Sequence, residues 1–234
     1  MSEIYDFRSD TDFQRDFEYI HDNYEYIFRD FENMLQTSEQ IDAFTEEKLK
    51  YIKERNWEYM ICAVCATNGF LRALKWLRAQ DPPCPWDEKI TELSASNGHP
   101  NVLQWLRSQD PPCPWNEDIC YQLAIQNGHL NILKWLKAQN PHFPWSTSVC
   151  KDAVENGVYG HLHILKWLRA QDPPCPWDER VCQAAAANNH LHILKWLRAQ
   201  DPPCPWDEWT YVNAIENGHL NVAQWLRTQE PPCP

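Results

Sequence analysis

Cysteine and histidine are the residue types in this sequence whose side chains recur at spacings that could serve metal binding, disulfide formation or catalysis. The chain has ten cysteines among its 234 residues. Five of them stand at one place in a recurring Cys-Pro motif: Cys84, Cys113, Cys175, Cys204 and Cys233. Cysteines brought together by a fold can bind a metal ion or form disulfides. The chemistry therefore depends on how far apart the fold places them.

The spacing argues against chemistry between these cysteines. Equivalent residues in neighbouring helical units lie about 10 Å apart, the distance between packed helices. A disulfide requires Cα atoms within about 7 Å, and zinc requires sulfur atoms about 2.3 Å from one ion. Cys62 and Cys65 have CxxC spacing, but they align with helical core positions such as Tyr211 and Ala214. We expect packed, free and reduced thiols, and neither a metal nor another cofactor.

Histidines recur in the same way, at His99, His129, His161, His190 and His219. A general base requires a nucleophile or a carboxylate partner nearby, and the repeated motif supplies neither. The sequence contains no glycine-rich phosphate loop, no G-x-S-x-G and no H-E-x-x-H. We therefore expect no enzymatic activity.

These motifs belong to an internal repeat. The segment LKWLRAQDPPCPWDE occurs unchanged at 74–88, 165–179 and 194–208. One Trp series precedes a loop: Trp76, Trp105, Trp135, Trp167, Trp196 and Trp225. A second series follows the loop: Trp57, Trp86, Trp115, Trp145, Trp177 and Trp206. A short unit cannot bury two indoles alone, so we expect stacked units with two rows of buried Trp.

Each unit has the signals of two short helices. The first helix starts after a good N-cap residue: Asp87, Asn116, Ser146, Asp178 or Asp207. Asn-Gly pairs such as Asn127-Gly128 end it. The second helix is predicted from His129 to Ala138 in one unit, and Asp-Pro-Pro ends its equivalents. The predicted class is all-α.

We divide the chain into an acidic helical N-terminal segment, residues 1–56, and six repeats. The repeats occupy residues 57–85, 86–114, 115–144, 145–176, 177–205 and 206–234. Apolar residues three or four apart between Phe13 and Leu35 predict one amphipathic helix. We expect this helix to cap the stack; the alternative is that its aromatic stripe binds a partner or dimerises. The extra residues 158–160 form a tolerated loop or, alternatively, a bulge that offers Tyr159 to a partner.

The repeats resemble ankyrin repeats. The motif is a first-helix Ala, then Asn-Gly-His-Leu, then Ile/Val-Leu-Lys-Trp-Leu, as at Ala124, 127–130 and 132–136. It is similar to divergent ankyrin repeats of large DNA viruses and some protists. The resemblance implies a solenoid of helix-turn-helix units in which the recurring histidines tie neighbouring loops by hydrogen bonds. Cys-Pro-Trp replaces the usual Thr-Pro-Leu-His, and the unit falls short of the usual 33 or so residues, so β-hairpin fingers should be short or missing.

In ankyrin-like stacks the first helix lines the concave side, where we expect a protein partner. Positions nine and six residues before the glycine lie one turn apart and vary between units, whereas core positions barely change. The candidate partner-binding residues are Met60, Lys89, Glu92, Ile119, Gln122, Lys151, Arg180, Gln183 and Trp209. Trp209 lies outside both Trp series and is the strongest hot-spot candidate.

The net charge of the chain limits the classes of partner that it can bind. The net charge of −12 disfavours nucleic acid, which needs local positive charge. A basic row follows the second helices: Lys75, Arg78, Arg107, Lys134, Lys137, Lys166, Arg169, Lys195, Arg198 and Arg227. We expect it to be a solvated convex face that complements the helix C-termini; the alternative is a track for an acidic partner or nucleic acid.

The sequence contains no run of 18 apolar residues, so it predicts no membrane span. The acidic N-terminus lacks the apolar segment of a secretory signal. We expect a cytoplasmic location, in the host cytoplasm if the protein is viral. The sequence thus predicts a non-catalytic scaffold that binds a protein partner on its concave face. The alternative is a structural or self-assembling component that uses the aromatic N-terminal helix. The partner is unknown.

Overall fold

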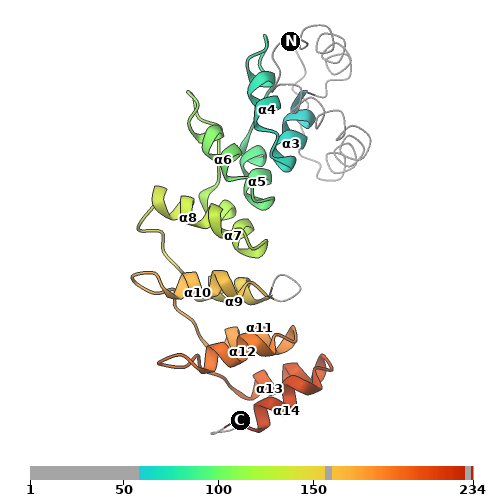
Figure 1. Cartoon of the computed structure of the whole chain (residues 1–234), viewed down its shortest axis with the longest axis vertical. Helices are drawn as coiled ribbons and strands as arrows, with labels where there is room; N and C mark the ends of the chain where they lie inside the picture. The colour runs from blue at the N-terminus through green and yellow to red at the C-terminus, as the bar shows by residue number, and fades with distance from the viewer. Residues whose placement is uncertain (1–57, 156–159, 230–232, 234) are drawn as a thin grey trace. The chain divides into compact units, whose positions relative to one another are not determined.

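The computed structural model describes residues 58–155, 160–229 and 233. Over these ranges the chain is all-α, with twelve helices and no strand (Figure 1). None of these helices has the length and apolar character needed to cross a bilayer. The predicted helix between Phe13 and Leu35, the predicted cap, Trp57 and the inserted Tyr159 lie outside the described residues.

Each sequence repeat forms two helices in succession, as predicted. The first helices are α3 (Glu58–Asn68), α5 (Glu88–Ser96), α7 (Glu117–Gln126), α9 (Thr147–Glu155), α11 (Glu179–Ala187) and α13 (Glu208–Glu216). The second helices are α4 (Leu71–Arg78), α6 (Pro100–Arg107), α8 (Leu130–Gln139), α10 (Leu162–Arg169), α12 (Leu191–Arg198) and α14 (Leu220–Arg227). The second helix of the third repeat begins one residue later than predicted, because His129 is its N-cap residue.

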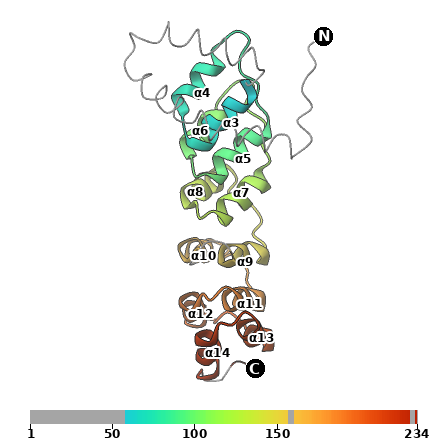
Figure 2. The ribbon, with the colours of Figure 1, turned by 90° about the vertical axis from the view of Figure 1, so that its right-hand side faces the viewer.

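The chain divides into an N-terminal unit, residues 1–120, and a C-terminal unit, residues 121–234. In the N-terminal unit α3 packs against α4 and α5, and α5 packs against α6. In the C-terminal unit α11 packs against α9 on one side and α13 on the other, and α9, α11 and α13 each pack against their own second helix. Figure 2 shows α9, α11 and α13 along one side of this unit and α10, α12 and α14 along the other.

The first helices begin directly after the predicted N-cap residues. The Asp87 carboxylate accepts a hydrogen bond from the Lys89 backbone N–H at 3.0 Å. The Asp178 carboxylate accepts one from the Arg180 backbone N–H at 3.1 Å. Asp207 accepts from the backbone N–H of Thr210 at 3.2 Å, within a reciprocal capping box. The caps satisfy N–H groups that the first turn of a helix leaves unpaired.

The turn between the two helices of a repeat passes through a left-handed residue. Gly128 has φ +81°, and a Cβ atom built there would lie 2.7 Å from the His161 ring of the following repeat. Glycine therefore serves two purposes, since it accepts the positive φ and leaves room for the ring. Asn189, with φ +60°, takes the place of glycine in the fifth repeat, in keeping with the tolerance of Asn for this region.

In the C-terminal unit the hydrophobic core lies between the first helices and the second helices of the repeats. Each second helix of the C-terminal unit buries the same three positions: Ile132, Leu133 and Leu136; Ile164, Leu165 and Leu168; Ile193, Leu194 and Leu197; and Val222, Ala223 and Leu226. Such a regular apolar stripe requires cover from both the first helix and the neighbouring repeat.

The prediction of two separate rows of buried Trp needs correction. The indoles of both series are half-buried throughout the described residues. Edge-to-face contacts join a loop Trp to the helix Trp of its own repeat, with ring centres 5.9 Å apart for Trp145–Trp167 and 6.1 Å apart for Trp177–Trp196. Edge-to-face pairs are a favoured aromatic geometry. The indoles therefore tie the loop to the second helix, and part of each ring stays open to other groups.

Candidate partner-binding surface

Eight of the nine predicted partner-binding residues are exposed or half-buried, and Met60 is the exception. Met60 is 2% exposed and lies inside the hydrophobic cluster of the N-terminal unit. The repeat register assigned it to the surface, but α3 buries eight consecutive residues from Tyr59 to Ala66. A helix that is covered all round has no solvent-facing row. Met60 is therefore a core residue, and its assignment to a binding surface was wrong.

The other candidates of the N-terminal unit lie on α5 and α7. Lys89 is exposed and forms an ion pair of 3.7 Å with the half-buried Glu92, one turn along α5. Burial raises the pKa of the Glu92 carboxyl, and the Lys89 charge only partly offsets the rise. Ile119 is half-buried. This surface is thus a small polar pair beside a partly covered apolar side chain.

In the C-terminal unit, α9, α11 and α13 bring together Lys151, Arg180, Gln183 and Trp209, which we call the helix 1 surface. Gln122, on α7, is exposed in the same unit. Lys151 donates to Glu155 at 2.8 Å within α9. Arg180 and Gln183 lie on α11 and Trp209 lies on α13, and these two helices pack against each other. One partner can therefore contact all three side chains together.

Polar contacts hold two members of the helix 1 surface in place. The Arg180 guanidinium donates to the Thr147 hydroxyl of the preceding repeat at 2.7 Å and to the Asp178 carboxylate at 2.6 Å. The hydrogen bond from Arg180 lowers the pKa of Asp178 below its usual range. The Gln183 amide donates to the Asp207 carboxylate of the next repeat at 2.9 Å. These two side chains therefore link the fourth, fifth and sixth repeats.

Trp209 is 55% exposed on α13. Three of its equivalents in other repeats, Lys89, Ser148 and Arg180, are exposed as well, whereas Ile119 is half-buried and Met60 is buried. Two other large apolar side chains in the described residues are exposed, Ile215 at 42% and Leu220 at 69%. Their equivalents in earlier repeats are covered, as at the fully buried Ala186 and the half-buried Leu191. Trp209 thus occupies a position that three of the other repeats leave open to solvent, unlike Ile215 and Leu220.

Half of the basic row departs from the solvated face that we expected, and the other half, Lys75, Lys134, Lys166, Lys195 and Arg227, is exposed. The residue eight positions before each loop Trp places its cation over that indole: Arg78, Arg107, Lys137, Arg169 and Arg198 over Trp86, Trp115, Trp145, Trp177 and Trp206. Three of these arginines also donate to the carbonyl of the loop Cys at 2.6 Å: Arg107, Arg169 and Arg198. The constant spacing of eight residues in the sequence was the signal that sequence reasoning missed.

The loop cysteines are buried, and thiols among them form weak hydrogen bonds with backbone carbonyls. The Cys113 thiol contacts the carbonyl of Asp87, the N-cap residue of its own repeat, at 3.3 Å, and Cys233 contacts that of Asp207 at 3.2 Å. Burial raises the pKa of Cys113 to about 12 and that of Cys233 to about 11, which disfavours the reactive thiolate. No group of three or more metal-binding side chains occurs among the described residues.

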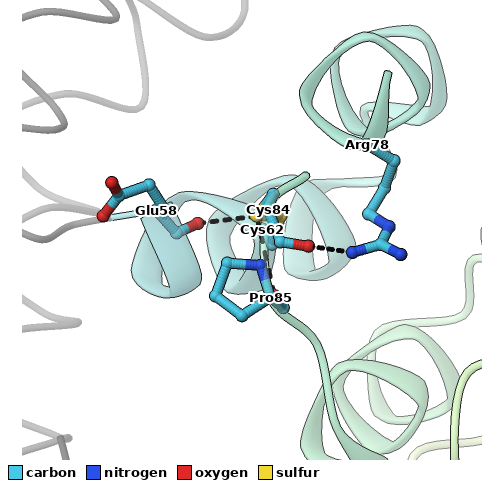
Figure 3. The surroundings of a disulfide bond; sticks show 5 residues. All are labelled: Glu58, Cys62, Arg78, Cys84 and Pro85. Atoms are coloured by element: carbon cyan, nitrogen blue, oxygen red, sulfur yellow. Dashed lines mark hydrogen bonds between the residues drawn. A yellow bond between two sulfur atoms is a disulfide. The ribbon is translucent and has the colours of Figure 1, made fainter. Parts of the chain in front are cut away.

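One pair of cysteines is oxidised, which corrects the expectation that all are free. Cys62 on α3 and Cys84 in the loop of the same repeat form a disulfide with Cα atoms 6.9 Å apart (Figure 3). The spacing argument compared cysteines in neighbouring repeats and overlooked the pairing of the first helix with its own loop. The Glu58 carbonyl oxygen lies 2.8 Å from Cys84 Sγ, and the Arg78 guanidinium donates to the Cys84 carbonyl.

Three of the recurring histidines link successive repeats by hydrogen bonds, as the resemblance implied, whereas the buried Nε2 of His190 has no hydrogen-bond partner among the described residues. Nε2 of His99 donates to the Thr67 carbonyl at 2.7 Å, and that of His161 to the Gln126 carbonyl at 2.9 Å. His219 makes the equivalent bond of 3.0 Å to Ala187. These bonds give the three histidines a structural role at the turn, where the rings of His99 and His161 also lie close to Gly69 and Gly128 of the preceding repeat.

No known protein-family model matches the chain, and no curated protein matches it in sequence.

Proposed function

We propose that the chain is a non-catalytic scaffold of ankyrin-like repeats that binds a protein partner through the helix 1 surface. The observation that carries the proposal is the exposure of Trp209 at a position that three other repeats also keep open. A Trp side chain has roughly 150–250 Å² of surface to bury, and Trp and Arg are the residues most enriched in interface hot spots.

The side chains around Trp209 support a binding role. Arg180 is fixed by Thr147 and Asp178, and Gln183 by Asp207, on the helix next to α13. A side chain that is already ordered loses less conformational entropy when a partner binds. Half of the Arg180 side chain remains exposed, at 52%, and can donate to a partner's acceptor. The surface therefore combines an aromatic anchor with a preordered polar neighbour.

The basic row has no part in the proposal, because Arg78, Arg107, Arg169 and Arg198 lie over indoles and donate to loop carbonyls. Nucleic-acid binding would depend on the exposed lysines and Arg227. Self-assembly through the aromatic N-terminal helix is the alternative, and that helix lies outside the described residues. The proposal keeps a cytoplasmic location for the chain, in the host cytoplasm if it is viral.

Comparative affinity capture from the native cell tests the proposal. A tagged wild-type chain is compared with a double variant, Arg180→Ala and Trp209→Ala, and with a control that carries Lys166→Ala and Lys195→Ala. We expect the wild-type chain and the control to recover the same partner. The double variant should recover at least about tenfold less, since loss of a hot spot weakens binding by 2 kcal/mol or more. Equal recovery by all three folded chains contradicts the proposal.

A further inference from the structure

Three of the six repeats carry a second cysteine on the first helix, opposite the loop cysteine. The pairs are Cys62 with Cys84, Cys150 with Cys175, and Cys182 with Cys204. The partners are 22, 25 and 22 residues apart in the sequence. The three additional residues of the middle pair are the insertion 158–160, so all three pairs have the same place in their repeats. Only the first pair is joined covalently, and the other four cysteines are free.

The two free pairs have the contacts that bond formation requires. Sγ of Cys150 lies 3.1 Å from Sγ of Cys175. In the fifth repeat Sγ of Cys182 lies 3.9 Å from the Cys204 carbonyl oxygen, the same distance that separates Sγ of Cys150 from the Cys175 carbonyl oxygen. All four side chains are fully buried, so the repeat itself holds each pair together. Disulfide formation demands this proximity, which most cysteine pairs in a fold lack.

We propose that Cys150–Cys175 and Cys182–Cys204 are oxidation sites that form intra-repeat disulfides equivalent to Cys62–Cys84. The oxidant is a small-molecule disulfide. One thiolate attacks it to give a mixed disulfide and releases one small thiol. The second cysteine of the pair then attacks the mixed disulfide, releases the second small thiol and closes the bond. Each pair thus loses two protons and two electrons, and the small disulfide is reduced to two thiols.

Each of the remaining three repeats has a cysteine at only one of the two positions, so these repeats serve as internal controls. Thr91 lies on the first helix in the repeat of Cys113, and Tyr211 in that of Cys233. In the third repeat Cys120 is on the first helix, and Phe143 takes the place of the loop cysteine. Complete oxidation therefore has a defined end point, with three disulfides and four thiols among the ten cysteines.

Burial sets the rate of the reaction. The hydrogen bond with Cys175 and burial both raise the pKa of Cys150, and the same causes raise the pKa of Cys204 through Cys182. Few thiolates are present in the closed repeat, so exchange requires local opening of the loop. Each bond would then fix the loop to the first helix next to the helix 1 surface, since Cys150 precedes Lys151 and Cys182 follows Arg180 by two residues.

The test uses the full-length chain, fully reduced and then incubated with oxidised glutathione. Remaining thiols are alkylated in denaturant, and the chain is weighed and mapped by mass spectrometry. We expect six hydrogens lost, four alkyl groups added, and peptides linked as Cys62–Cys84, Cys150–Cys175 and Cys182–Cys204. Stable glutathione adducts at these positions, other pairings, or closure of Cys62–Cys84 alone would overturn the proposal.

A pair of variants keeps the test independent of folding defects. Cys150→Thr with Cys182→Thr removes one member of each new pair, and Thr is the natural residue at this position in the second repeat. The oxidised wild-type chain should melt several degrees above the reduced chain, and in the variant this difference should shrink to the contribution of Cys62–Cys84. An undiminished difference contradicts the proposal. Neither readout depends on a partner, so failure here leaves the proposed function untouched.

Discussion

The guanidinium carbon of Arg169 lies 3.8 Å from the centre of the Trp177 ring. The same guanidinium donates a hydrogen bond of 2.6 Å to the Cys175 carbonyl. Arg169 ends α10 and Trp177 begins the next repeat, so this one side chain spans the loop between two repeats. The arrangement recurs with Arg78, Arg107 and Arg198 in other repeats, and Lys137 takes the cation's place in the third.

Replacement of Arg169 by Ala should therefore destabilise the C-terminal unit by about 2 kcal/mol, from the lost cation–π contact and hydrogen bond. Arg169→Lys should lose less, because Lys137 takes this position over Trp145, at 5.1 Å from the ring centre. Lys166→Ala, an exposed change on the same helix, is the control and should stay within about 0.5 kcal/mol of wild type. Denaturant unfolding measures all three. If Arg169→Ala matches Lys166→Ala, the arginine does not hold the loop.

The helical repeat frame was predictable because each of its signals is local. Asp87, Asp178 and Asp207 were identified as N-caps from one residue type at one spacing, and the structure shows each of them accepting the expected bond. The histidine bonds followed from the resemblance to ankyrin repeats. The caps depend on backbone geometry within a few residues of the signal, whereas the histidine bonds join residues at least 32 positions apart.

Features that depend on contacts across the repeat were missed. The Cys62–Cys84 bond joins residues 22 apart, and no local pattern marks the pair. Met60 was placed on the surface by its register, whereas cover on every side of α3 decides its burial. The position of Trp209 was predicted, and its exposure agrees with the prediction. The polar contacts that fix Arg180 and Gln183 depend on the neighbouring repeats and could not be inferred.

Gly128 and Gly218 offer a matched comparison of the turn. Both have a left-handed φ, +81° and +74°, so Ala at either position should cost about 1–2 kcal/mol in backbone strain. At Gly128 the new Cβ also meets the His161 ring, which must move and lose its 2.9 Å bond to Gln126. No heavy atom of the described chain lies within 4 Å of a Cβ at Gly218.

Gly128→Ala should thus destabilise the chain more than Gly218→Ala, by about 1 kcal/mol for the lost hydrogen bond. Thermal and denaturant unfolding of the two variants measure the difference. Equal destabilisation would mean that the histidine ring contributes nothing to the turn.

Glu92 should give the N-terminal unit a defined pH dependence. Burial raises the pKa of this carboxyl in the folded chain, so the folded state binds the proton more tightly than the unfolded state. The ionised group therefore destabilises the fold at neutral pH, and the penalty disappears as the pH falls through the raised pKa. We expect Glu92→Gln to stabilise the chain at neutral pH by less than about 1 kcal/mol and to lose this advantage near pH 4.

Urea unfolding of wild type and Glu92→Gln at the two pH values checks this prediction. A variant that is less stable than wild type at neutral pH would show that the ion pair with Lys89 outweighs the effect of burial. An advantage that persists unchanged at low pH would have a cause other than titration of Glu92.

Site-specific photo-crosslinking tests the binding claim most directly. An aromatic photoreactive residue replaces Trp209 in one chain and the exposed Lys195 of α12 in another, and both are expressed in the native cell. The helix 1 surface predicts a crosslinked protein partner from position 209 and none from position 195. A partner captured at position 195 but absent at position 209 would contradict the assignment of the binding surface.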